Sequence, residues 1–151
     1  MLADTDIIET CIPHRKPMRL VERLLTSQDD QATVESFVRP YWPGAAGGFA
    51  DPVLLIEVVA QSVAVLVGWQ RRHEEKMGGR GLLVGVRKTK IQCDQLRVGD
   101  RLQSHVELLY KVENYAVYQG QVLDDEGRLL AQVELQSYRP DDFPGAIEEN
   151  P

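Results

Sequence analysis

The longest apolar stretch in the chain runs from position 52 to position 69 and is broken by three polar residues, Glu57, Gln61 and Ser62. It is too long for an ordinary strand, so the pattern predicts a helix despite its many valines. Asp51 is a good N-cap for this helix, and Pro52 suits its first position because the missing N–H would have no intrahelical partner.

Glu57 and Gln61 are four residues apart, so they share one face of the predicted helix. The stretch also approaches the length of a membrane span, but a carboxylate and an amide near its middle would be costly in lipid. A core helix is therefore favoured, and a helix that is apolar on all sides is wrapped by other structure. We expect its acid to be enclosed as well. An enclosed carboxylate usually has either a neutralising partner or a functional role.

Shorter segments with the period-two pattern predict strands on both sides of the helix. Two precede it, at 18–26 and 32–38, and the others follow at 82–92, 102–112, 115–123 and from 129 onward. The amphipathic segment Met1–Cys11 predicts a short helix or an arm, and Tyr41–Phe49 is a loop rich in Gly, Pro and Ala that leads into the helix. Met77–Gly81 predicts a flexible connection after it.

One hairpin, one long apolar helix and a meander of three or four strands indicate an α+β domain rather than a doubly wound one. The economical packing is the hotdog fold, in which an antiparallel sheet of five to six strands wraps around one long central helix. We predict a single domain over residues 1–138 and a loose acidic tail at 139–151. Because such a sheet has an exposed edge, we expect a dimer.

Composition narrows the choice of partners. The chain has 151 residues, a net charge of −6 and a pI near 5.1, which argues against binding to nucleic acid. Positive charge is dense only at Arg71–Arg72 and Arg87–Lys90. A solvated face is the usual meaning of such clusters, and a docking patch for an acidic partner is the less favoured alternative.

The cysteines and histidines show no pattern that indicates a cofactor or a metal. Cys11 and Cys93 form no metal motif and, since no signal peptide is evident, are expected to be reduced thiols in a cytoplasmic protein. His14, His73 and His105 have no metal-ligand spacing. No Gly-rich phosphate loop and no nucleophile elbow are present in the sequence.

Three segments, in this order, resemble the β-hydroxyacyl-(acyl carrier protein) dehydratases of fatty acid synthesis. Ile12–Arg23 is similar to the family's opening Leu-Pro-His-Arg-x-Pro motif and the strand after it. Leu54–Gln61 is similar to its helix motif, in which the acid is catalytic. Arg97–Leu102 and Val106–Leu109 are similar to its turn and third-strand region, so the resemblance covers residues 12–138.

The resemblance implies a hotdog dimer whose active sites draw on both chains and take an acyl carrier protein thioester. A histidine and the helix acid of that family convert a 3-hydroxyacyl thioester to the trans-2-enoyl thioester. A base removes the α-proton, an acid protonates the leaving hydroxyl, and N–H donors hold the thioester oxygen. An apolar tunnel beside the helix excludes water and so strengthens each polar contact.

This sequence departs from the family pattern at two positions. The family's histidine lies fourteen residues before the acid, where this chain has Pro43, and there is no histidine between His14 and His73. A glycine five residues before the acid offers its N–H to the thioester oxygen in the family, whereas Pro52 has none. The chain is closer to a divergent, dehydratase-like branch of aryl-polyene and other specialised acyl pathways, which keeps the Glu and the Ala-Gln but not the loop histidine.

Glu57 is therefore the first candidate catalytic residue, because an enclosed carboxyl with no neighbouring Lys or Arg in sequence should have a raised pKa. His14 is the candidate replacement base, and its alternative is a structural histidine in the loop. We assign substrate binding to Gln61, which is expected to orient Glu57 or nearby backbone, and to Gly47, Gly48 and Phe49, whose loop leaves room for close backbone approach.

Three functions remain open at this point. The first is a dehydratase-like enzyme acting on 3-hydroxyacyl carrier-protein thioesters as a homodimer or higher oligomer. The second is a non-catalytic acyl-binding or partner subunit in a heterodimer with a related dehydratase, which the prolines at positions 43 and 52 favour. The third is a hotdog thioesterase in which Glu57 activates water.

Overall fold

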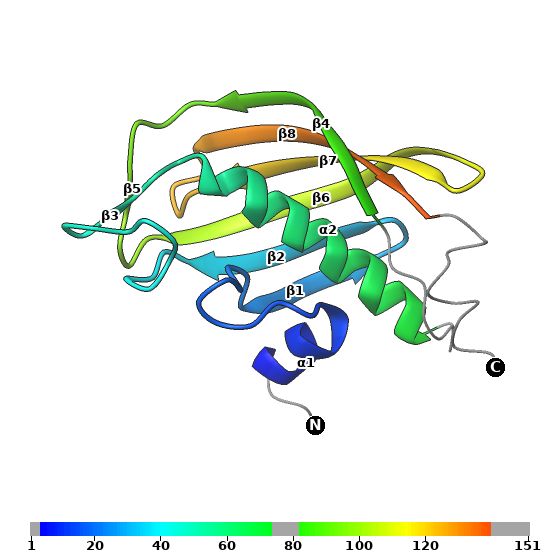
Figure 1. Cartoon of the computed structure of the whole chain (residues 1–151), viewed down its shortest axis with the longest axis horizontal. Coiled ribbons are helices and arrows are strands. Elements are labelled where there is room, and N and C mark those ends of the chain that lie inside the picture. Colours follow the sequence, from blue (N-terminus) through cyan, green and yellow to red (C-terminus); the bar gives the residue numbers. More distant parts are fainter. Residues whose placement is uncertain (1–3, 74–81, 140–151) are drawn as a thin grey trace.

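The computed structural model describes residues 4–73 and 82–139, which form two helices and eight strands (Figure 1). The predicted connection at Met77–Gly81 and most of the predicted tail lie outside the described residues. In chain order the elements are α1 (Asp4–Cys11), β1 (Arg23–Gln28), β2 (Gln31–Phe37), β3 (Phe49–Ala50), α2 (Leu54–His73), β4 (Leu82–Ile91), β5 (Leu96–Arg97), β6 (Arg101–Val112), β7 (Tyr115–Leu123) and β8 (Leu129–Tyr138).

Six strands form one antiparallel sheet in the order β1-β2-β6-β7-β8-β4. The sheet curves around α2, which crosses it diagonally, while α1 lies beside β1 and the C-terminal part of α2 (Figure 1). This is the hotdog arrangement, so the predicted fold class is confirmed. The strand that follows the helix in sequence, β4, lies at the edge of the sheet opposite to β1.

Helix α2 begins at Leu54, two residues after the predicted first position at Pro52, and the predicted cap lies just before it. The Asp51 carboxylate accepts a hydrogen bond from the N–H of Val53 at 2.9 Å, which confirms Asp51 as the cap. The helix is long and apolar enough to span a membrane by composition alone, but in this fold its apolar side chains pack against the sheet. Those that are fully enclosed are Leu55, Val58, Val59, Val65 and Leu66.

The helix lies very close to the sheet at Gly120 on β7. A Cβ atom built at this position would lie 2.4 Å from Cγ1 of Val59 and 3.2 Å from Cγ1 of Val106. Val59 is fully buried and β-branched, so it has little freedom to move away. The glycine is therefore needed for the helix to lie at this height above the sheet.

Two local features differ from the sequence prediction. The first strand begins at Arg23 rather than at Met18, because the backbone at Met18 and Leu20 is bonded to a helix side chain instead of a neighbouring strand. A second, two-stranded sheet of β3 and β5 pairs Phe49 with Arg97 and was not predicted, since two-residue strands have no detectable alternation.

We predict that Gly120→Ala lowers the free energy of unfolding by about 1–3 kcal/mol, the usual range for overpacking a core. Gly85→Ala is the matched control, because its new Cβ would meet only the Gln136 side chain, at 3.9 Å. Urea denaturation measures both. Adding Val59→Ala to Gly120→Ala should recover part of the loss, and fully additive effects would contradict the proposed contact.

Candidate active site

Glu57 lies in the first turn of α2 and is half-buried. Burial raises the pKa of its carboxyl above the ordinary value, and the nearby charge of His14 and a hydrogen bond with Gln61 partly oppose this. The structure thus brings together the three residues that the sequence analysis placed first. The carboxyl retains its proton to a higher pH than an exposed glutamate, which suits a group that donates a proton.

Gln61 connects the helix to the segment that follows His14. Its side chain is 1% exposed, and its Oε1 accepts a hydrogen bond from the N–H of Leu20 at 2.8 Å. Its Nε2 donates to the carbonyl of Met18, also at 2.8 Å. Both ends of the amide are therefore used within the protein, and a role for Gln61 in substrate binding stays a prediction.

His14 lies in a tight loop between α1 and this segment. The loop is anchored by Ile12, which is buried, and by Arg15, whose guanidinium donates to the carbonyl of Ile12 at 2.9 Å. The carbonyl of Arg15 in turn accepts from the N–H of Met18 at 2.8 Å. Nδ1 of His14 is buried and has no hydrogen-bond partner among the described residues. An unused ring nitrogen beside a carboxyl is suited to proton transfer.

The start of α2 offers no N–H group to a ligand. Pro52 has none, and the N–H of Val53 is bonded to the Asp51 side chain. The next two N–H groups, of Leu54 and Leu55, donate to the carbonyls of Asp51 and Pro52 at 3.0 and 2.9 Å. N–H donors for any ligand oxygen bound near this helix must therefore come from another part of this chain or from a second chain.

The loop before the helix ends in a tight turn at Gly47 and Gly48, whose φ angles of 61° and 85° favour glycine. Ala46 and Phe49 close the turn by exchanging backbone hydrogen bonds of 2.9 and 3.1 Å. The carbonyl of Gly48 accepts from Val98, and within the described residues no hydrogen bond uses the N–H of either glycine. Phe49 is 39% exposed. Substrate binding by these three residues stays a prediction.

The remaining candidates lie away from Glu57 or outside what can be described. His105 is a surface residue on the outer face of the sheet, where its Nδ1 forms a hydrogen bond of 2.9 Å with the hydroxyl of Thr33. The side chain of His73 is outside the described residues. Cys11 and Cys93 are free thiols. Among the described residues no cluster of three metal-ligating side chains occurs.

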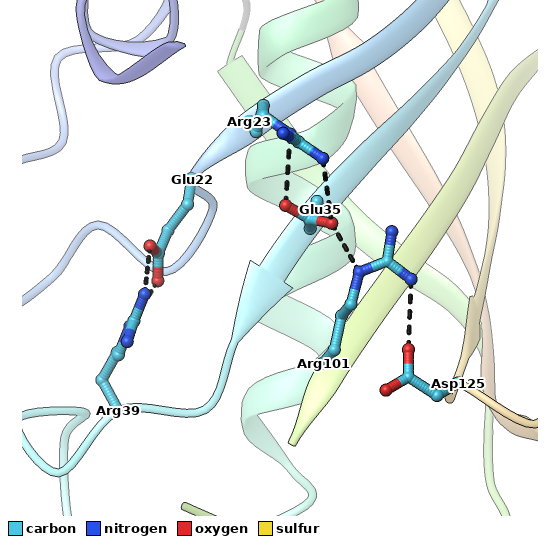
Figure 2. Close-up of polar contacts among 6 residues, drawn as sticks. All are labelled: Glu22, Arg23, Glu35, Arg39, Arg101 and Asp125. Atoms are coloured by element: carbon cyan, nitrogen blue, oxygen red, sulfur yellow. Dashed lines mark hydrogen bonds and ion pairs between the residues drawn. The ribbon is translucent and has the colours of Figure 1, made fainter. Parts of the chain in front are cut away.

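Sequence analysis missed a charged network at the ends of β1, β2 and β6 (Figure 2). The carboxylate of Glu35 is buried between Arg23, at 3.2 Å, and Arg101, at 2.5 Å. Arg101 also contacts Asp125 at 3.1 Å. These partners are far apart in sequence, so no local pattern indicates them.

Figure 2 also shows a separate ion pair, which joins two loops of the candidate site. The guanidinium of Arg39 donates two hydrogen bonds to Glu22, both of 2.7 Å. Glu22 follows the segment that Gln61 holds, and Arg39 begins the loop that leads to Gly47. Two-point contacts of this kind fix geometry better than single ones, so this pair sets how the two loops lie relative to each other.

Comparison with known proteins places this arrangement in a family. The family model described as ApeP-like, ApeP dehydratase, matches residues 7–148. The chain belongs to the ApeP-like dehydratase family. It is also 33% identical, over 87% of its length and 99% of the other protein, to the 3-hydroxyacyl-[acyl-carrier-protein] dehydratase FabZ of Pelotomaculum thermopropionicum.

Solved structures agree on the fold of this ApeP-like chain. The dehydratase heterocomplex ApeI:P from Xenorhabdus doucetiae matches with a TM-score of 0.79 and 23% identity, covering 95% of this chain and 97% of the matched chain. A hypothetical thioesterase from Streptococcus pneumoniae TIGR4, solved with coenzyme A, matches with a TM-score of 0.58 and 15% identity over 78% and 86% of the two chains. Resemblance to the dehydratases, predicted from three motifs, is confirmed.

We predict that Glu57→Gln changes the pH dependence of stability. An unfolded glutamate titrates near pH 4.3, and burial raises the pKa of Glu57 in the folded chain. Folding therefore retains a proton that the unfolded chain releases, so wild-type stability falls as pH rises through this window. The Glu57→Gln variant has no carboxyl to titrate and does not lose this stability. Its free energy of unfolding, relative to that of wild type, should therefore increase from pH 4 upward. Denaturant titrations across pH measure this, and a difference that shrinks with rising pH would contradict it.

We further predict that Gln61→Leu lowers the free energy of unfolding by about 2 kcal/mol or more, because it leaves the N–H of Leu20 and the carbonyl of Met18 without a partner. Gln70→Leu is the control from the same helix, since the amide of Gln70 is bonded to Asp29 at an exposed site. Its effect should remain within about 0.5 kcal/mol. Equal losses of the free energy of unfolding in the two variants would contradict a stabilising role for the hydrogen bonds of Gln61.

Proposed function

We propose that the chain is a dehydratase-like protein of the cytoplasm that acts on 3-hydroxyacyl carrier-protein thioesters and gives trans-2-enoyl thioesters. The observation that carries this proposal is the half-buried Glu57 carboxyl, with its raised pKa, next to His14. The kinship with FabZ supports the substrate class. An acid that retains its proton beside an imidazole with an unused nitrogen supplies the two groups that elimination of water needs.

In the proposed reaction His14 takes the α-proton of the thioester and Glu57 gives its proton to the β-hydroxyl. The carbon–oxygen bond breaks, water leaves, and the α and β carbons become doubly bonded. After the reaction His14 is protonated and Glu57 is ionised. Return of the proton from the imidazolium to the carboxylate restores the site for the next turnover. Donors for the thioester oxygen are not supplied by the start of α2.

A second candidate function is that of a partner subunit that carries no chemistry of its own. The specific observation in its favour is the closed helix start, where Pro52 and the Asp51 cap remove the donors that a thioester oxygen requires. Assembly with a related dehydratase would let a second chain provide both the donors and a base. The ApeI:P heterocomplex, which has the same fold, supports this alternative.

The experiment that separates these functions incubates the pure chain with a 3-hydroxyacyl carrier-protein thioester and follows the enoyl product by mass. We expect turnover that falls at least about 100-fold in Glu57→Gln and in His14→Ala, the lower range for loss of a general acid or base. Gln70→Leu, which lies on the same helix and away from Glu57, should retain full turnover.

Each other outcome selects a different function. If the chain binds the acyl carrier protein but shows no turnover, the proposal of an enzyme is wrong and that of a partner subunit is supported. Release of free thiol, independent of the 3-hydroxyl, would instead identify a thioesterase, in which Glu57 activates water.

A further inference from the structure

His14 lacks the ring contact that usually orients a histidine acting as a base. Nδ1 of its imidazole is buried and has no hydrogen-bond partner in the part of the chain that the structure describes. In catalytic sites this nitrogen commonly donates to a carbonyl or a carboxylate, which fixes the tautomer and the direction of the ring. The direction of the imidazole beside Glu57 therefore depends on packing and on how the backbone of its loop is held.

The guanidinium of Arg15 holds this backbone through all three of its nitrogen atoms. Nη1 donates to the carbonyls of Ile12 and of His14 itself, at 2.9 and 2.8 Å. Nη2 donates to the carbonyl of Glu9 at 3.1 Å, and Nε lies 3.4 Å from the Glu9 carboxylate. Glu9 is in the last turn of α1, so Arg15 also caps the negative end of that helix. We refer to these contacts of Arg15 with Glu9, Ile12 and His14 as the arginine clamp.

Helix α1 is a firm support for the arginine clamp. It lies beside β1 and α2, with Ile8 and Ile12 buried in the core (Figure 1). A Cβ atom built at Gly68 of α2 would lie 2.5 Å from the carbonyl oxygen of Cys11, so the two helices approach as closely as only a glycine permits. A group that α1 holds therefore keeps its place relative to α2, the helix that carries Glu57.

The Glu9 carboxylate also faces a second, buried guanidinium. The side chain of Arg19 is 2% exposed, and its Nη1 lies 3.6 Å from the other carboxylate oxygen of Glu9. Nε and Nη1 of Arg19 are buried and have no hydrogen-bond partner among the described residues. Replacement of a buried ion by an apolar residue is often neutral or stabilising, whereas removal of its partner alone is strongly destabilising. Arg19 must therefore be replaced before the effect of Glu9 on His14 can be measured.

We propose that Arg15 and Glu9 are positioning residues for His14. They hold its imidazole beside Glu57, and helix α1 is their support. The inference rests on the proposed function, in which His14 is the base. A misplacement of roughly 1 Å can lower a rate about 100-fold, so a base without a ring contact depends on a well-held backbone. Both residues act through the backbone of the His14 loop and not on the substrate.

Arg15→Leu tests the arginine clamp directly, because it removes every contact of the guanidinium. The side chain is 52% exposed, so the fold should tolerate the change. We expect kcat for dehydration to fall about 10- to 100-fold with little change in KM, since the geometry of the reaction is lost rather than binding. Arg15→Lys should restore kcat only in part, because an ammonium lacks the planar fork that reaches several acceptors.

Nuclear magnetic resonance of histidine-labelled chain gives a measurement without substrate. The ring signals of His14 are identified by their loss in His14→Ala. In Arg15→Leu they should shift and broaden, because the loop no longer has one fixed arrangement. The ring signals of His105, on the outer face of the sheet, should stay as in wild type.

The contribution of Glu9 is measured in a chain that already contains Arg19→Leu. This single variant should melt at or above the wild-type temperature and keep its kcat, since Glu9 still faces Arg15. Addition of Glu9→Gln should then lower kcat and broaden the His14 signals. The effect should be smaller than that of Arg15→Leu, because the backbone carbonyl of Glu9 still accepts from Arg15. An unchanged kcat in the double variant would overturn the role of Glu9.

Thr10→Ala is the matched control on the same helix. Thr10 is exposed, and its hydroxyl accepts a hydrogen bond of 3.2 Å from Arg72 of α2, so its contact does not involve the His14 loop. The variant should keep the kcat and the His14 signals of wild type. Equal effects of Thr10→Ala and Arg15→Leu would overturn the proposal, because the docking of α1 as a whole would then explain both.

Failure of this inference and failure of the proposed function give different results. Unaltered His14 signals in Arg15→Leu would overturn the arginine clamp, whatever the turnover. Displaced signals in a chain whose wild type shows no turnover would support the clamp and reject the enzyme. Displaced signals with full turnover would overturn the positioning role in the reaction together with the assignment of His14 as the base.

Discussion

The structure depends on the enclosure of one helix that is apolar on nearly every side. Such a helix is stable in water only if other elements cover it, and here the curved sheet and α1 do so. The contact is close enough that β7 has a glycine directly beneath Val59. The same packing fixes the direction of each polar residue on the helix. Gln61 is directed inward to the backbone of the preceding segment, whereas Glu57 stays at the margin of the core.

Two glutamates in this chain show how partners decide what a buried acid does. Glu35 is more deeply buried than Glu57, but two guanidinium groups neutralise its charge and make it part of the scaffold. For Glu57, burial outweighs the opposing influences of the His14 charge and the hydrogen bond with Gln61, so its pKa is raised. An acid that is enclosed but not held by arginine remains available for chemistry.

The fold could be predicted from sequence because its main signals are local. The apolar run with its Asp51 cap and the alternating strands each specify an element, and one helix among six strands leaves few ways to pack. Glu57 stood out for a related reason, as a lone acid within that run. The contacts of Gln61 with Met18 and Leu20, and the pair of Arg39 with Glu22, could not be predicted because each joins positions that only the tertiary fold brings together.

The cap at Asp51 has an electrical consequence for the whole neighbourhood of the helix start. The positive end of a helix dipole ordinarily attracts a carboxylate or a phosphate of a ligand. In this chain a carboxylate of the protein itself already occupies that position, and the first turn is saturated by its own backbone. The positive end of this helix is thus occupied by the protein itself. Negative charge on any bound ligand must therefore be balanced by groups that lie elsewhere.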